Sequence, residues 1–101
     1  MEKYTVITGA SSGIGLEMAK ILASKNYNLI LVARNFDRLQ SIKHDLESKY
    51  SIKVKIFRKD LSLSANAEAL YLEIKRENLE VEYLINNAGV GITGPIEEIP
   101  T

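Results

Sequence analysis

The chain has 101 residues with thirteen basic and thirteen acidic side chains and a formal net charge of zero, which gives no electrostatic footprint for nucleic acid or an anionic membrane. It contains no cysteine, which excludes disulfides and thiolate metal sites, and its length allows one domain with a modest core. Because no leader-like or membrane-spanning apolar run is present, we expect a soluble, cytoplasmic protein that binds neither nucleic acid nor membrane.

Strands and helices alternate in the first half of the chain. Residues 4–8 (YTVIT) are short and β-branched and end at a glycine, which is typical of a buried strand. Apolar residues at helical spacing then predict a helix from Ile14 to Lys25. Residues 28–33 (NLILVA) are apolar throughout after Asn28, as expected for a strand covered on both faces. A second amphipathic helix follows, with Asn35 as its N-cap.

The second half continues the alternation with a strand of a different kind. Residues 53–57 (KVKIF) alternate lysine with apolar side chains. This pattern indicates a strand with one solvent-exposed face, located at the edge of a sheet. Ser62 or Ser64 is expected to cap a third helix. The apolar residues that share one face of this helix are Ala67, Leu70, Tyr71 and Ile74. Residues 81–85 (VEYLI) form a fourth strand, followed by a turn-rich stretch.

This order of elements predicts an α/β fold with a doubly wound parallel sheet of the Rossmann type. Right-handed crossovers, with the strand of residues 53–57 at the edge, predict the strand order 3-2-1-4. That order is the first half of such a sheet plus the first strand of its second half. The fourth strand would keep one unpaired edge, which is a template for pairing with another chain, so we expect a homo-oligomer.

The loop after the first strand is rich in glycine. The sequence TGASSGIG, residues 8–15, places Gly9, Gly13 and Gly15 between a strand and a helix. A helix N-terminus there offers unpaired N–H groups and the positive end of the helix dipole, both suited to a pyrophosphate. Ser11 and Ser12 can add hydroxyl donors. The spacing differs from G-x-G-x-x-G and from a P-loop, but its place in the sheet predicts a dinucleotide site rather than a simple turn.

The same loop resembles the cofactor loop of the short-chain dehydrogenases/reductases, in the branch that uses T-G-x-x-x-G-x-G. Three further stretches agree with that family in the same order: ARNFDRL (33–39), DL (60–61) and NNAG (86–89). The resemblance implies that residues 1–101 are a partial NAD(P)-binding domain without the catalytic C-terminal half. It also implies a parent enzyme that reduces carbonyls or oxidises alcohols on a small substrate.

The resemblance assigns roles to residues at the pyrophosphate and ribose. The residues that would surround the pyrophosphate are Gly9, Ser11, Ser12, Gly13, Ile14 and Gly15. Those that would line the ribose and steady the sheet are Asn87, Ala88 and Gly89. Thr8 would form a hydrogen bond across to the strand that ends at this last motif.

Other residues would bind the adenosine end of the cofactor. By resemblance, Asp60 would accept a hydrogen bond from the adenine amino group, and Leu61 would pack on the ring or donate its N–H. NAD-binding sheets place an acidic residue at the end of the second strand, whereas an arginine suits the 2′-phosphate of NADP. Here that position holds Ala33 followed by Arg34, whose planar guanidinium matches a phosphate. The expected cofactor is therefore NADP(H) in preference to NAD(H).

No catalytic residue and no metal site is predicted. Family chemistry requires a tyrosine, a lysine and a serine that lie beyond the NNAG motif. Tyr71 and Lys75 have the required Tyr-x-x-x-Lys spacing, but they precede that motif, and Tyr71 is interpreted as a core residue of the third helix. Two functions stay open: the cofactor-binding part of an NADP(H)-dependent oxidoreductase, or a non-catalytic dinucleotide-binding or interaction module complete at this length.

Overall fold

The computed structural model describes residues 2–61, 64–87 and 96–98. Its elements alternate in the predicted order, with one short strand added at the end. The strands are β1 (Lys3–Thr8), β2 (Asn28–Ala33), β3 (Val54–Arg58), β4 (Glu80–Ile85) and β5 (Ile96–Glu98). The helices are α1 (Gly13–Ser24), α2 (Phe36–Lys49) and α3 (Ser64–Arg76). The predicted bounds of the first four strands and of the first helix are confirmed to within one residue.

One sheet holds all five strands in the order β3-β2-β1-β4-β5. The first four pair in parallel, which confirms the predicted order 3-2-1-4. The last strand, β5, runs antiparallel to β4 and pairs Ile96 with Ile85. The expectation that the outer edge of β4 stays unpaired is therefore wrong, because β5 occupies that edge. The homo-oligomer remains a prediction, but an unpaired edge of β4 no longer supports it.

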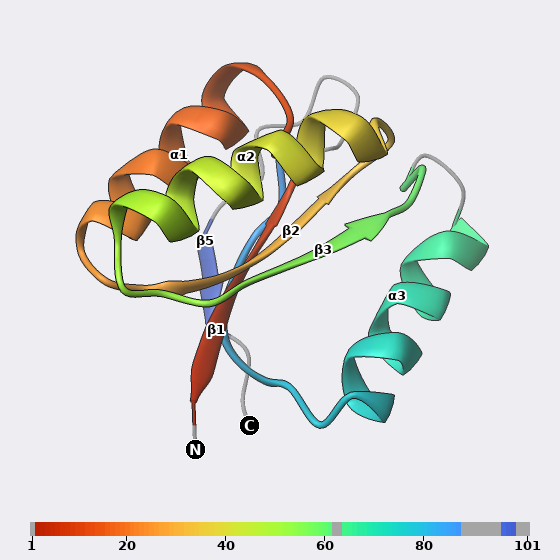
Figure 1. Cartoon of the computed structure of the whole chain (residues 1–101). Coiled ribbons are helices and arrows are strands. Elements are labelled where there is room, and N and C mark those ends of the chain that lie inside the picture. The colour runs from red at the N-terminus through yellow and green to blue at the C-terminus, as the bar shows by residue number, and fades with distance from the viewer. Residues whose placement is uncertain (1, 62–63, 88–95, 99–101) are drawn as a thin grey trace.

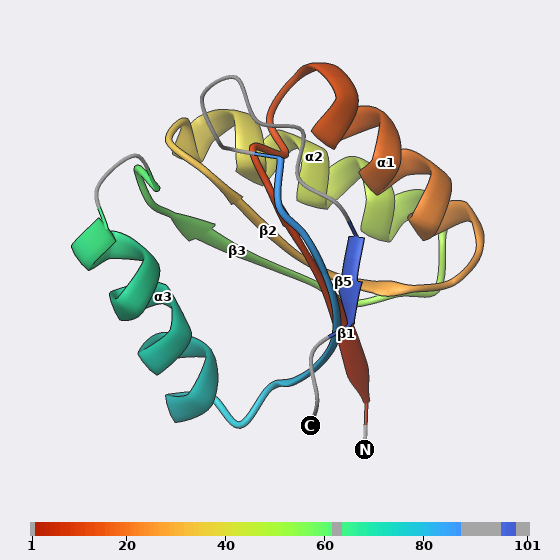
Figure 2. The ribbon, with the colours of Figure 1, turned by 180° about the vertical axis from the view of Figure 1, so that it is seen from behind.

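Helices cover both faces of the sheet (Figures 1 and 2). On the side of α1 and α2, the core includes Ile7, Leu29 and Leu39, all fully buried. On the side of α3, a second core includes Ile30 and Leu70. Successive residues of β2 join different cores because side chains alternate across a strand. Burial on both faces accounts for the continuously apolar sequence of β2.

The second helix begins at its predicted N-cap. Asn35 Oδ1 accepts a hydrogen bond from the Arg38 backbone N–H over 3.0 Å. Asp37 lies in the first turn and Lys49 in the last, so each charge complements the nearer end of the helix dipole. Because β2 ends at Ala33 and the cap is Asn35, the single residue that links strand to helix is Arg34.

The third helix buries a narrower stripe than its sequence pattern predicts. Leu70 and Ile74 are buried, but Tyr71 is 58% exposed, so its interpretation as a core residue is wrong. Lys75 Nζ lies 5.4 Å from the centre of the Tyr71 ring. Within the described ranges, α3 is the only helix on its face of the sheet, so the flank that carries Tyr71 has no second helix to pack against. The caps predicted at Ser62 or Ser64 lie outside the described side chains.

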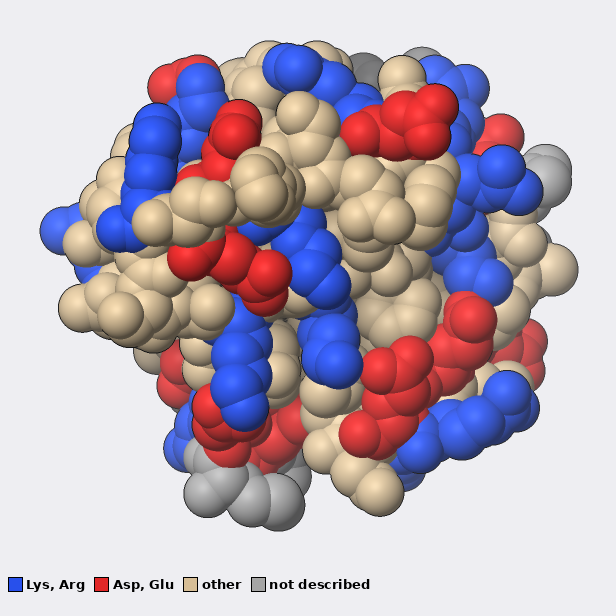
Figure 3. All heavy atoms as spheres, in the orientation of Figure 1, with Lys and Arg blue, Asp and Glu red and all other residues tan. Residues whose placement is uncertain are grey.

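Charged residues of both signs are interspersed over the face that Figure 3 shows. In the part of the chain that the structure describes, no helix combines the length and the apolar character needed to cross a membrane. The same residues contain no cluster of three or more side chains suited to holding a metal ion.

Candidate functional site

The loop between β1 and α1 contains two residues whose backbone favours glycine. Gly9 has φ 64° and Gly13 has φ 59°, in the left-handed region that other residues enter at a cost of about 1–2 kcal/mol. The Ala10 N–H donates a hydrogen bond to Val32 O over 3.2 Å. This bond keeps the loop close to the carboxyl end of β2 before α1 begins.

The third glycine of the motif lies inside α1, against the loop. A Cβ atom at Gly15 would lie 2.3 Å from Gly9 O and 2.9 Å from Asn87 Nδ2. Both distances are shorter than non-bonded carbon atoms tolerate, and the first is to a backbone atom that cannot move aside. Gly15 therefore permits α1 to approach both the loop and the residue that follows β4.

The N-terminus of α1 faces this loop. Ser12 is the N-cap with an extended backbone, and its side chain makes no capping hydrogen bond. The Leu16 N–H donates to Ser12 O over 3.4 Å, so the amides of residues 13–15 have no acceptor within the helix. The first turn carries no acidic side chain. These amides and the helix dipole together suit an anion.

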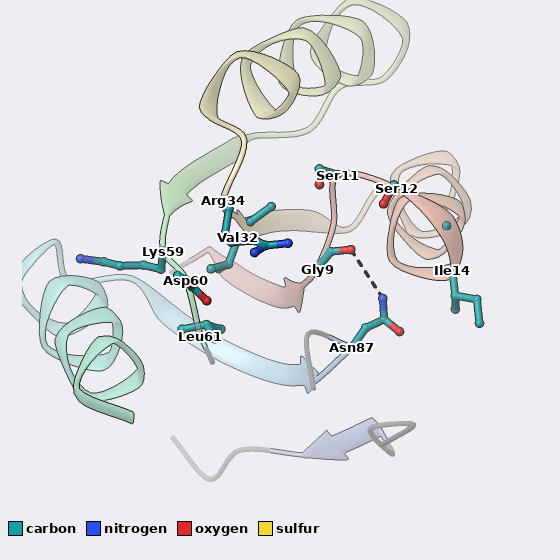
Figure 4. Close-up of a pocket in the computed structure, with 12 residues that line it drawn as sticks. Gly9, Ser11, Ser12, Ile14, Val32, Arg34, Lys59, Asp60, Leu61 and Asn87 are labelled. Atoms are coloured by element: carbon teal, nitrogen blue, oxygen red, sulfur yellow. Dashed lines mark hydrogen bonds between the residues drawn. The ribbon is translucent and has the colours of Figure 1, made fainter. Parts of the chain in front are cut away.

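A cavity of about 390 Å³ lies at the carboxyl ends of the central strands. Its lining comes from the glycine loop, the ends of β2 and β3 with the residues that follow them, and the residues after β4. The lining residues are Gly9, Ser11, Ser12, Gly13, Ile14, Val32, Ala33, Arg34, Lys59, Asp60, Leu61 and Asn87. Figure 4 shows the loop residues on one side of this cavity and Asp60 and Leu61 on the other.

The cavity brings together most of the residues that the sequence singles out. The predicted site residues that line it are Gly9, Ser11, Ser12, Gly13, Ile14, Arg34, Asp60, Leu61 and Asn87. Gly15 supports the loop without lining the cavity, and Ala88 and Gly89 lie outside the described residues. Val32 and Lys59 also line the cavity and were not predicted as site residues. Their positions beside the ends of β2 and β3 are the only sequence signal that points to them.

A hydrogen-bond network joins the end of β1 to the end of β4. The hydroxyl oxygen of Thr8, a buried residue, accepts from the Asn87 backbone N–H over 2.7 Å. The Thr8 hydroxyl also lies 3.0 Å from Asn86 Oδ1, and Asn87 Nδ2 donates to Gly9 O over 3.5 Å. The predicted bond from Thr8 to the fourth strand's end is present, and it positions Asn87 against the glycine loop.

Replacing Thr8 with valine is expected to lower the free energy of unfolding by about 1–3 kcal/mol, because the Asn87 amide loses its acceptor in a partly buried position. Thr5→Val is the matched control: Thr5 is equally buried, and its hydroxyl has no hydrogen-bond partner among the described residues. Urea denaturation of both variants measures the difference. Equal stabilities of the two variants would contradict the role given to Thr8.

Two arginines near the glycine loop occupy different positions. Arg34 lines the cavity and points toward Gly9 in Figure 4. Arg38, one turn into α2, donates from Nε to Ser11 O over 3.1 Å. Arg38 therefore ties α2 to the glycine loop, a contact that sequence reasoning missed because nothing in the local pattern around Arg38 marks a long-range partner.

A model of the short chain dehydrogenase family matches residues 3–101. The chain belongs to this family. Among curated relatives, it is 42% identical over 95 residues to a very-long-chain 3-oxoacyl-CoA reductase of Pyrenophora tritici-repentis. That match covers 92% of this chain and 28% of the reductase, so the chain spans somewhat over a quarter of the length of this relative.

Solved structures of the family carry the same fold. L-sorbose reductase from Gluconobacter frateurii, solved with NADPH and L-sorbose, matches with a TM-score of 0.80 at 34% identity. This match covers 88% of the chain and 34% of that structure. A short-chain dehydrogenase from Sphingobium yanoikuyae in complex with NADPH matches with a TM-score of 0.78 at 36% identity, over 87% of this chain and 34% of that one. Both of these structures therefore contain NADPH.

Proposed function

We propose that the chain binds NADP(H) in the cavity at the carboxyl ends of its parallel strands, as the cofactor-binding part of a short-chain oxidoreductase. The observation that carries this proposal is the convergence of three groups on one cavity. These are the glycine loop with the open amides of α1, Arg34 after β2, and Asp60 with Leu61 after β3.

Each of these groups suits a different part of the cofactor. The amides of residues 13–15 and the loop hydroxyls would hold the pyrophosphate, since they present donors and no acidic side chain. The Arg34 guanidinium would pair with the 2′-phosphate of the adenosine ribose, and Ala33 places no carboxylate beside it. Asp60 and Leu61 would contact the adenine, and Asn87 the ribose next to the nicotinamide.

The chemistry that the bound cofactor supplies is hydride transfer, which in the family reduces a carbonyl or oxidises an alcohol. The reductase names of the relative and of the sorbose-bound neighbour favour carbonyl reduction. The chain's own residues contribute binding and orientation: the loop and Arg34 fix the phosphate end, and the network of Thr8 and Asn87 fixes the ribose side.

Calorimetric titration of the chain with NADPH and with NADH tests the proposal. We expect NADPH to bind at least about tenfold more tightly, since a charge-assisted hydrogen bond contributes roughly 1.5–3 kcal/mol. Equal affinities would contradict the choice of cofactor. Absence of binding for both dinucleotides would contradict the proposal as a whole.

We also expect the 101-residue chain alone to catalyse no hydride transfer. General acid catalysis requires a proton donor beside the substrate oxygen, and none of the chain's five tyrosines lines the described cavity. Tyr71 and Lys75 lie on α3, outside its lining. A panel of carbonyl compounds with NADPH, followed by NADPH absorbance, should show no turnover above buffer. Turnover that disappears in Tyr71→Phe would overturn this expectation.

A further inference from the structure

Residues 59–61 form the wall of the cavity that lies opposite the glycine loop. Asp60 and Leu61 face the cavity, whereas the Lys59 side chain points away from it toward α3 (Figure 4). This segment follows β3, the edge strand of the sheet, and no strand among the described residues pairs on its outer side. Its position must come from contacts with neighbouring elements.

Contacts with α3 and with the sheet hold the segment. Asn66 Nδ2, in the first turn of α3, donates to Asp60 O over 2.9 Å. Lys59 Nζ lies 2.6 Å from Glu73 Oε2, and the two side chains are only 20% and 37% exposed. The third contact runs to the sheet, where the Lys59 N–H donates to Ala33 O over 3.0 Å.

We propose that α3 positions the residues of the cavity that contact the adenine, with Asn66 as a positioning residue and the Lys59–Glu73 ion pair as a second contact from the same helix. This inference rests on the proposed binding of NADP(H). Asn66 does not line the cavity. Its hydrogen bond holds the peptide group between Asp60 and Leu61, which orients the Leu61 N–H and positions the backbone from which the Asp60 side chain extends.

The physical reason is the geometry that base recognition demands. A carboxylate distinguishes the 6-amino group of adenine from a carbonyl only when its oxygen is held within hydrogen-bond distance and in line. Asp60 belongs to a segment between β3 and α3 that lies outside regular secondary structure. A hydrogen bond from a helix to its carbonyl, together with a partly shielded ion pair one residue earlier, restricts the backbone of this segment.

The first test compares NADPH with its hypoxanthine analogue, which carries a carbonyl in place of the 6-amino group. We expect wild type to prefer NADPH by about tenfold, as one hydrogen bond to a charged group allows. In Asn66→Ala this preference should fall to about twofold, and in Lys59→Met it should fall partially, with recovery in Lys59→Arg. Glu68→Ala, an exposed position on the same helix, is the control and should keep the wild-type preference.

The second test needs no cofactor. In Asn66→Ala, hydrogen exchange of the Lys59 amide should accelerate about tenfold, while exchange of the Ala10 amide, bonded to Val32 O on the glycine-loop side, should not change. An unchanged base preference together with unchanged Lys59 exchange would overturn the inference, as would a uniform loss of affinity for both dinucleotides. Failure of wild type to bind NADPH would instead overturn the proposed function and the adenine role with it, and the Lys59 exchange would still decide whether α3 holds the segment.

Discussion

Replacing Gly15 with alanine is expected to abolish measurable NADPH binding and to lower the free energy of unfolding by about 3 kcal/mol. The added Cβ would lie 2.3 Å from Gly9 O, and overpacking against a backbone atom typically costs about 1–3 kcal/mol because the elements must move apart. Moving α1 away from the loop displaces the amides of residues 13–15, which the proposal assigns to the pyrophosphate. Both losses therefore have one cause.

Gly13→Ala separates this effect from the general cost of losing a glycine. A Cβ at Gly13 would meet nothing within 4 Å, so its cost is limited to the left-handed backbone, about 1–2 kcal/mol. Urea denaturation gives the stabilities, and calorimetry with NADPH gives the affinity of Gly15→Ala. If Gly15→Ala were no less stable than Gly13→Ala, the close approach of α1 would not explain the third glycine.

The fold was predictable from sequence because each element carries a local signal. Continuous apolar character marked β2 as buried on both faces, and alternating lysines marked β3 as the edge strand. Parallel strands joined by helices admit few arrangements once handedness is fixed, so the strand order followed. The short strand β5 carried no such signal, since three residues in a turn-rich stretch do not establish a periodicity.

The candidate site was predictable to the extent that its residues sit in motifs at strand ends. The glycine loop, Arg34 and Asp60 are each adjacent in sequence to a strand end, and parallel strands bring those ends to one edge of the sheet. Contacts made by Arg38 and Asn66 were not predictable, because each residue is one polar position among many on a helix. Their partners, Ser11 and Asp60, are set by how the helices dock.

For Tyr71, the helical periodicity of the sequence predicted burial that the structure does not show. Its spacing places it on the apolar stripe of α3, yet 58% of it is exposed. Apolar residues at helical spacing show which side chains can be buried together. Actual burial also requires another element packed against that flank of the helix. The same flank of α3 borders an apolar groove that includes Leu70 and Leu84.

Replacing Arg34 with glutamate is expected to reverse the cofactor preference. In wild type the guanidinium lies in the cavity wall next to Ala33, where a planar fork matches a 2′-phosphate and no carboxylate opposes it. The variant carboxylate would repel that phosphate and accept hydrogen bonds from the ribose hydroxyls of NADH instead. We expect NADPH affinity to fall by about 100-fold while NADH affinity stays within about threefold of wild type.

Arg38→Glu makes the same change of charge one helical turn away and is the matched control. Because Arg38 bonds to Ser11 O and does not line the cavity, its replacement should weaken both dinucleotides through the loop without changing their ratio by more than about threefold. Calorimetric titrations at two salt concentrations complete the test, since a screened long-range effect weakens with salt much more than a direct contact. An equal shift of preference in the two variants would mean that the net charge of the rim, and not the Arg34 contact, selects NADP(H).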